Sequence, residues 1–230
     1  MCFHNSMSVK VKELARRYGR KSDVVEIYRD ILDEQYHVNA FNFPKYPVIT
    51  TEDEVQVYNW GLIPFWTKAE PEEIRSMTLN ARAETLFTKP SFREPIRMRR
   101  CLVPSTGYFE WRHEGKKKIP YYIYLKEEPI FSIAGIYDVW TDKETGEQLT
   151  TFSIITTTTN PLTDYIHNTK HRMPAILSKE DEEKWLNPDL SKVEIEALLR
   201  PFSADKMDAY RIKNDFIRKA PTDKTILEKA

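Results

Sequence analysis

Short segments in which apolar and polar positions alternate fill the middle of the chain, and this period of two is typical of β-strands. Polar turns containing glycine separate several of them, such as the run His113-Glu114-Gly115-Lys116, which favours antiparallel neighbours. The pattern predicts strands over residues 48–50, 55–60, 101–103, 108–112, 121–125, 130–140 and 149–157. The last two form a predicted hairpin.

Apolar positions with helical spacing occur nearer the two ends of the chain. The segment 9–18 has this spacing and stops at Gly19, a residue common just past the end of a helix. Asp23 can cap a second helix, which carries Val24, Ile27, Tyr28 and Ile31 on its apolar face. Two capping boxes predict short late helices, one over 178–181 and one over 191–194.

Strands and helices do not alternate regularly, which argues against a doubly wound sheet. We therefore expect an α+β protein with a mainly antiparallel, barrel-like β core and peripheral helices. No stretch of the 230 residues is long or polar enough to be a linker, so a single domain over residues 1–230 is expected.

Composition limits the class of protein further. No apolar run approaches the length of a membrane span and no signal-peptide core is present, so we expect a cytoplasmic protein with no membrane partner. We also expect a monomer. A formal net charge of zero argues against coating nucleic acid by bulk charge but permits a local basic groove. Two cysteines, Cys2 and Cys101, are too few for a zinc site without histidines, so no metal or other cofactor is expected.

Cys2 follows the initiator methionine directly. Trimming of Met1 would leave Cys2 with a free α-amine beside its thiol, which together form a 1,2-aminothiol. The α-amine has a reference pKa of about 7.7–8.0 and is partly unprotonated near neutrality, so it can attack an aldehyde. The neighbouring thiol can then close on the imine carbon to form a thiazolidine. The alternative is a chance cysteine at a frayed terminus.

The run Asn80-Ala81-Arg82-Ala83-Glu84-Thr85 holds an amide, a guanidinium and a carboxylate together. In one interpretation Asn80 caps a helix and Glu84 pairs with a nearby arginine. In the other, Arg82 holds a phosphate and Asn80 orients the terminal amine or a sugar hydroxyl. The residues alone leave both interpretations open.

Glu110 interrupts an aromatic strand that ends in Trp111. If the carboxyl is buried, it needs hydrogen-bond donors or a cation, or it takes up a proton and can then serve as a general acid or base. If it faces solvent, it has no such role. Trp111 either stacks on a base or belongs to the core.

Two of the five histidines, His167 and His171, lie just before Arg172-Met173-Pro174. Histidine titrates near neutrality and can protonate a departing oxygen. An ordinary pair of surface histidines is the alternative.

These motifs, in this order, resemble those of the SOS-response-associated peptidase (SRAP) domain family. The resemblance covers nearly the whole chain, through Met1-Cys2 and the runs 60–66, 80–85, 100–111, 120–124, 131–137 and 172–174. It implies a protein that binds single-stranded DNA and traps abasic sites through the terminal cysteine.

The resemblance also implies a role for each matching residue. Cys2 matches the crosslinking nucleophile, and Asn80 matches the asparagine that positions its amine. Glu110 matches the glutamate that acts as acid and base, removes the initiator methionine and reverses the crosslink. His167 matches the active-site histidine, because the Ile-His pair is retained at 166–167, and His171 is the second choice.

The chain departs from the family pattern near its start, where His4 stands in place of a phosphate-contacting arginine. The contacts to DNA implied by the resemblance are therefore Arg82, Trp66, Trp111, His171 and Arg172. Two other functions remain open: a cysteine peptidase acting in trans, and a non-covalent reader of modified DNA.

Overall fold

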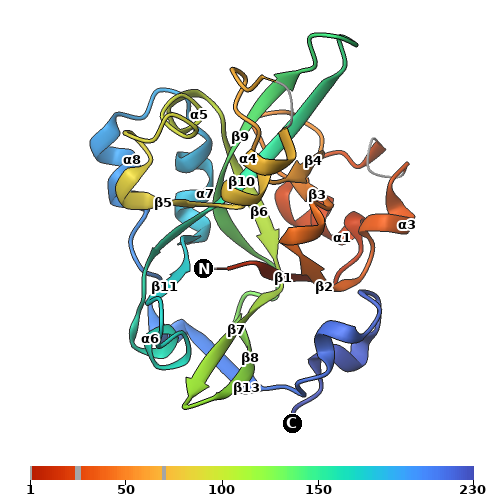
Figure 1. Cartoon of the computed structure of the whole chain (residues 1–230), viewed down its shortest axis with the longest axis vertical. Coiled ribbons are helices and arrows are strands. Elements are labelled where there is room, and N and C mark those ends of the chain that lie inside the picture. The colour runs from red at the N-terminus through yellow and green to blue at the C-terminus, as the bar shows by residue number, and fades with distance from the viewer. Residues whose placement is uncertain (1, 24–26, 69–70) are drawn as a thin grey trace.

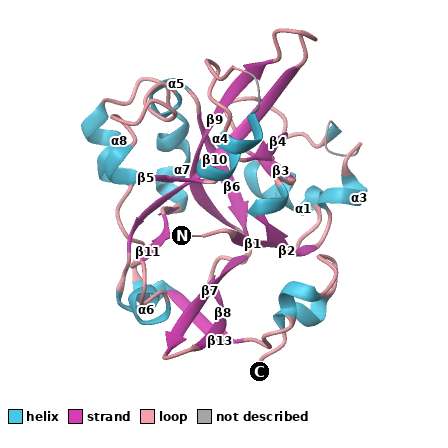
Figure 2. Cartoon of the chain, in the orientation of Figure 1, coloured by secondary structure: helices cyan, strands magenta, loops and turns pink. Residues whose placement is uncertain are grey.

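The structure is a computed structural model that describes residues 2–23, 27–68 and 71–230. Strands run through its middle and helices lie on the outside (Figure 2). The α-helices are α1 (Val11–Tyr18), α3 (Arg29–Leu32), α4 (Pro71–Met77), α5 (Pro95–Met98), α6 (Pro161–Ile166), α7 (Lys179–Leu186) and α8 (Lys192–Leu198). Short 3-10 helices include Ala83–Thr85 and Phe216–Arg218.

One sheet has the strand order β13-β8-β7-β1-β2. Its strands are β1 (His4–Met7), β2 (Gln35–Asn39), β7 (Gly107–Glu114), β8 (Lys117–Leu125) and β13 (Met207–Arg211), and all the neighbours are antiparallel. β1 therefore lies between β2 and β7, although it is the first strand of the chain, and Figure 1 shows it near the centre of the molecule.

The second sheet is organised around the long hairpin of β9 (Phe131–Thr141) and β10 (Gln148–Thr158). Its other strands are β3 (Lys45–Val48), β4 (Gln56–Trp60), β5 (Asn80–Arg82), β6 (Arg100–Ser105), β11 (Arg172–Pro174) and β12 (Ile176–Leu177). β4 and β5 pair with β10 in parallel, and the remaining pairs are antiparallel. β10 thus carries both β5 and β11.

A tight contact at Gly107 holds β7 against β8 beside β1. The ring of Tyr122 lies so close that a Cβ at position 107 would come within 2.3 Å of its Cζ atom. The hydroxyl of Tyr122 donates a hydrogen bond to the carbonyl oxygen of Thr106 at 2.8 Å. Position 107 therefore requires glycine, because a methyl group would displace the ring.

The predicted α+β class with a mainly antiparallel core is confirmed. The sheets are curved, and within the described residues neither closes into a barrel, because both strand orders end at edge strands. The helix expected to end at Gly19 does so, and this glycine has a left-handed backbone with φ of 61°. Residues 24–26 of the second predicted helix lie outside the described residues.

Two expected caps differ in the structure. Asn80 does not cap a helix, since it is the first residue of strand β5. Ser191 forms the predicted capping box, whereas the hydroxyl of Ser178 donates to the Asp181 carboxylate and caps no backbone N–H group. None of the helices in the described ranges has the length and apolar character needed to span a membrane.

Candidate functional site

Cys2 lies two residues before the first residue of β1 and is fully buried. The pairing of Asn5 with Tyr108 and of Ser6 with Gly107 fixes β1 alongside β7, so the start of the chain cannot fray from the sheet. Its thiol lies 3.8 Å from the carbonyl oxygen of His4. Burial, and next the negative charge of Glu110, raise the pKa of the Cys2 thiol far above its ordinary value. The thiol therefore needs a base to react.

Glu110 lies in β7 and is 5% exposed. Of the two interpretations of this residue, the structure thus favours the buried carboxyl. Burial raises the pKa of Glu110 to about 7. A carboxyl that titrates near neutrality can both donate and accept a proton at the working pH, as general acid–base catalysis requires.

His167 follows the last residue of α6 and is 6% exposed. Its Nδ1 atom lies 2.9 Å from the carbonyl oxygen of Arg172 and 3.7 Å from Oε1 of Glu110. A carbonyl only accepts hydrogen bonds, so Nδ1 carries the proton and Nε2 carries the lone pair. Burial lowers the pKa of His167 to about 4, which keeps the ring neutral near pH 7.

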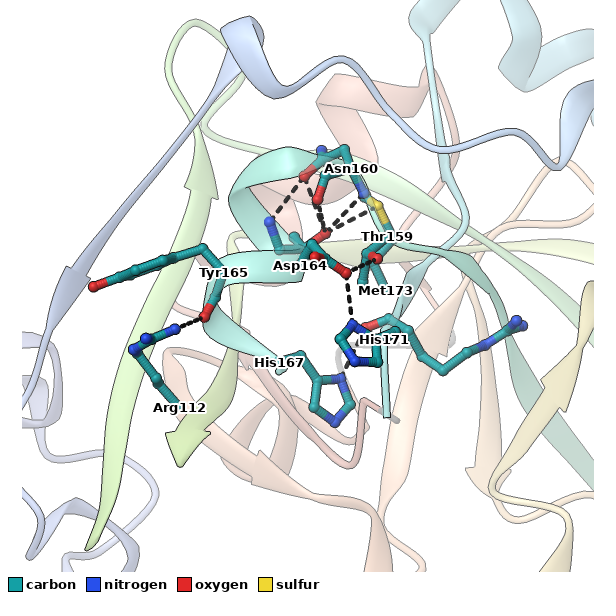
Figure 3. A network of polar contacts seen from close by, with 10 residues as sticks. Arg112, Thr159, Asn160, Asp164, Tyr165, His167, His171 and Met173 are labelled. Carbon is teal, nitrogen blue, oxygen red and sulfur yellow. Dashed lines mark hydrogen bonds and ion pairs between the residues drawn. The ribbon is translucent and has the colours of Figure 1, made fainter. Parts of the chain in front are cut away.

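Several polar contacts fix the position of His167 (Figure 3). Asn160 and Thr163 form a capping box at the start of α6. After α6, the side-chain amide of Asn168 both accepts from and donates to the backbone of His113 in β7, at 3.0 and 2.9 Å. The loop that holds His167 is therefore attached to the strand that holds Glu110.

His171 lies on the outside of the same loop, with a left-handed φ of 51°. Its Nδ1 atom is 2.6 Å from the Asp164 carboxylate, and its side chain is 56% exposed. Of the two candidate histidines, the structure brings only His167 next to Glu110.

A cleft of about 480 Å³ opens over this group. Its lining combines aromatic, apolar and basic side chains: Phe3, His4, Glu110, Trp111, His113, Lys118, His167, Thr169, Lys170 and Ile217. Such a mixture of apolar walls and a few converging polar groups is typical of a ligand site.

Asn80 is 8% exposed in β5, and neither its side-chain oxygen nor its nitrogen has a hydrogen-bond partner in the described part of the chain. An unpaired buried amide is costly, so this side chain is available to a ligand. The structure gives no hydrogen bond between Asn80 and Cys2, Glu110 or His167. Arg82, two residues further along β5, is exposed.

Arg172 has a structural contact that the sequence suggested only in general terms. Its guanidinium makes two hydrogen bonds to the Glu84 carboxylate, at 2.6 and 3.0 Å, and one to the carbonyl oxygen of Thr156. The expected pairing of Glu84 with an arginine is thus present. Because the carbonyl of Arg172 also binds His167, this residue links the 3-10 helix Ala83–Thr85, β10 and the histidine of the cleft.

The two tryptophans proposed to contact DNA lie in different surroundings. Trp66 is 46% exposed and lines a separate cleft of about 420 Å³ with Arg93 and Arg99. Trp111 lines the cleft over Glu110, but Phe216 stacks on its ring at 5.7 Å between centroids. The C-terminal part of the chain thus covers one side of Trp111.

Sequence reasoning missed a histidine pair beside the cleft. Nδ1 of His4 lies 2.8 Å from Nε2 of His37, and the two rings stack. Burial lowers the pKa of His4 to about 3 and that of His37 to about 4, so both are neutral near pH 7. The pairing of β1 with β2 brings them together, and only that strand pairing could have revealed it.

No three histidine, cysteine, aspartate or glutamate side chains of the described residues are grouped so that they could hold a metal ion. Cys101 is fully buried, and its backbone oxygen accepts a hydrogen bond from the indole of Trp185.

Solved structures of two bacterial proteins are similar to this fold. An X-ray structure from Bacteroides thetaiotaomicron has a TM-score of 0.99 and 72% identity, with 100% of both chains covered. One from Bordetella bronchiseptica has a TM-score of 0.77 and 21% identity, covering 92% of this chain and 100% of that one, and shares the fold.

Two proteins with similar sequences are named abasic site processing proteins. Abasic site processing protein YoqW of Bacillus subtilis is 38% identical over 203 residues, which are 80% of this chain and 88% of that protein. Abasic site processing protein HMCES of Gallus gallus is 35% identical over 164 residues, 62% of this chain and 48% of that protein. The model of the family described as SOS response associated peptidase (SRAP) matches residues 1–218. The chain therefore belongs to the SRAP family, as its motifs predicted.

Proposed function

We propose that this protein binds single-stranded DNA and forms a covalent thiazolidine crosslink to abasic sites through Cys2, after removal of Met1. The crosslink would shield the abasic site during the response to DNA damage. The observation that carries the proposal is the buried pair of Glu110 and His167 beside Cys2, at the bottom of a cleft. We expect the protein to act as a cytoplasmic monomer that associates with DNA.

The aldehyde of a ring-opened abasic site suits this arrangement. The α-amine of Cys2 attacks C1′, and the resulting carbinolamine loses water when Glu110 protonates its hydroxyl group. The thiol of Cys2 then adds to the imine carbon, and its proton passes through the Glu110 carboxylate to the nitrogen. One water is released overall, and the carbonyl that would promote strand cleavage is gone.

The neighbouring side chains have distinct roles in this proposal. The neutral His167, with its lone pair on Nε2, assists opening of the sugar ring. The unpaired amide of Asn80 would orient the amine of Cys2 or a sugar hydroxyl, which would satisfy its hydrogen-bonding capacity. The proposed contacts to DNA remain Arg82, Trp66, Trp111, His171 and Arg172, and the ion pair with Glu84 holds the Arg172 guanidinium in place.

Removal of Met1 by Glu110 would also explain the word peptidase in the family description. A peptidase that acts on other chains would cleave unrelated peptides, and a non-covalent reader would bind DNA in a complex that dissociates in denaturant. Neither alternative requires a covalent adduct with DNA. Detection of such an adduct therefore separates the proposal from both.

The test is the intact mass of the protein after incubation with a single-stranded oligonucleotide that contains one abasic site, measured under denaturing conditions. We expect the mass of the Met1-less protein plus the oligonucleotide minus one water. Cys2→Ala should give no adduct, while Cys101→Ala, which removes the other buried thiol, should give the same adduct as the unchanged protein. An adduct that persists in Cys2→Ala would refute the proposal.

A further inference from the structure

Two lysines line the cleft over Glu110. Lys118 belongs to β8, directly across from His113 of β7. Lys170 belongs to the loop between α6 and β11. Both side chains are exposed, and neither ammonium group makes a hydrogen bond or ion pair with any residue in the described ranges.

Lys118 and Lys170 are the lysines among the described residues that line the cleft, and no arginine lines it. Glu110 is the single carboxylate among the described lining residues, and it lies buried at the base. His4 and His37 are neutral because they are buried against each other. Arg112, next to His113 in β7, does not line the cleft and donates hydrogen bonds to the Glu114 carboxylate and to the carbonyl oxygen of Tyr165.

The loop that carries Lys170 is held in place. Asn168 binds the backbone of His113 on one side. On the other side, His171 binds Asp164 (Figure 3). Lys170 lies between these two attachments, so its backbone has little freedom, and the β7–β8 hairpin fixes Lys118 equally well. Two cations are thus presented to the cleft from separate, rigid elements.

We propose that Lys118 and Lys170 form a phosphate-binding site that grips the backbone of the nucleic acid strand on either side of the reacting sugar. The inference rests on the proposed function, because it assumes that this sugar enters the cleft over Glu110. A lysine ammonium suits this task as a compact point charge with three donors, and it does not require a defined base. The site would therefore bind a strand of any sequence.

The experiment is the binding of an unmodified, fluorescently labelled single-stranded oligonucleotide to the full chain, followed by anisotropy at several salt concentrations. Each phosphate contact contributes about 0.7 to the slope of log affinity against log salt for single strands. The double variant Lys118→Gln/Lys170→Gln should lower the slope by about 1.4 and weaken binding at least tenfold at about 50 mM salt. Lys117→Gln is the matched control, since its side chain leaves the opposite face of β8.

Unchanged slope and affinity in the double variant would overturn the inference. An equal loss in Lys117→Gln would overturn it as well, because bulk charge would then account for binding. A second readout isolates the proposed function: intact mass after treatment with glycolaldehyde, a small aldehyde without phosphate. We expect a mass equal to the Met1-less protein plus glycolaldehyde minus one water. This adduct should form at the same rate in the double variant as in the unchanged protein. Absence of that adduct in the unchanged protein would refute the Cys2 chemistry while leaving the salt slope to decide the lysine site.

Discussion

Replacing Glu110 by glutamine should make the protein more stable at neutral pH and inactive at the same time. Glutamine has nearly the same shape but carries no charge and transfers no proton. Because Glu110 is proposed to serve both the dehydration and the ring-closing steps, crosslink formation should slow by about 10²–10⁴-fold. The same burial that raises the pKa of Glu110 makes its ionised form unfavourable in the folded chain.

The size of the stability effect follows from the pKa of Glu110, which burial raises from 4.5 to about 7. Between these two values the folded chain holds the proton more tightly than the unfolded chain does. Protonated Glu110 therefore contributes stability that is fully present below pH 4.5 and is lost as the pH rises through about 7. The loss amounts to about 3 kcal/mol, and the Glu110→Gln variant, which cannot ionise, should not suffer it.

The assay is urea denaturation at pH 4.5 and 7.5 for both proteins. The free energy of unfolding of the variant, minus that of the unchanged protein, should grow by about 3 kcal/mol between the two pH values. Glu114→Gln is the control, because this carboxylate lies on the same strand but is exposed and pairs with Arg112. A difference that stays constant with pH, or shrinks, would show that Glu110 is not a desolvated carboxyl.

Two further predictions concern neighbours of the site. Gly107→Ala should lower the free energy of unfolding by about 1–3 kcal/mol, because the added methyl group meets the ring of Tyr122, and an unchanged urea midpoint would contradict this packing. At saturating oligonucleotide, His167→Ala should slow crosslinking by at least about tenfold, whereas His171→Ala, which removes an exposed side chain proposed to contact DNA and no group beside Glu110, should change this rate by less than about twofold. Equal losses in both variants, measured by the rate of adduct formation, would reverse the assignment of the active-site histidine.

Local patterns predicted much of the fold. The alternation over 130–140 and 149–157 corresponds to β9 and β10 within one or two residues, and Gly19 ends α1 as expected. Strand β5 was harder, since its three residues are too few for a period to appear. Asn80 therefore looked equally like a helix cap. Its strand partner, β10, lies more than 70 residues away, and no local signal announces that pairing.

The candidate site depended on motifs more than on patterns. The sequence allowed Glu110 to be either buried or exposed, because alternation assigns a side chain to one face of a strand without saying which face is covered. The residues found beside Glu110, Cys2 ahead of β1 and His167 in the loop after α6, lie far from it and from each other in the sequence. For the same reason the sequence pattern alone does not show that Lys118 lines the cleft or that Phe216 covers Trp111.

The interior position of β1 has a practical consequence for handling this protein. Since β1 is held on both sides by β2 and β7, and Phe3 lines the cleft over Glu110, an extension placed ahead of Cys2 would begin next to that cleft. An affinity tag at that end would crowd the opening and, under the proposed mechanism, would convert the amine that attacks the aldehyde into an unreactive amide. A tag after Ala230, which is exposed, leaves both the opening and the amine intact.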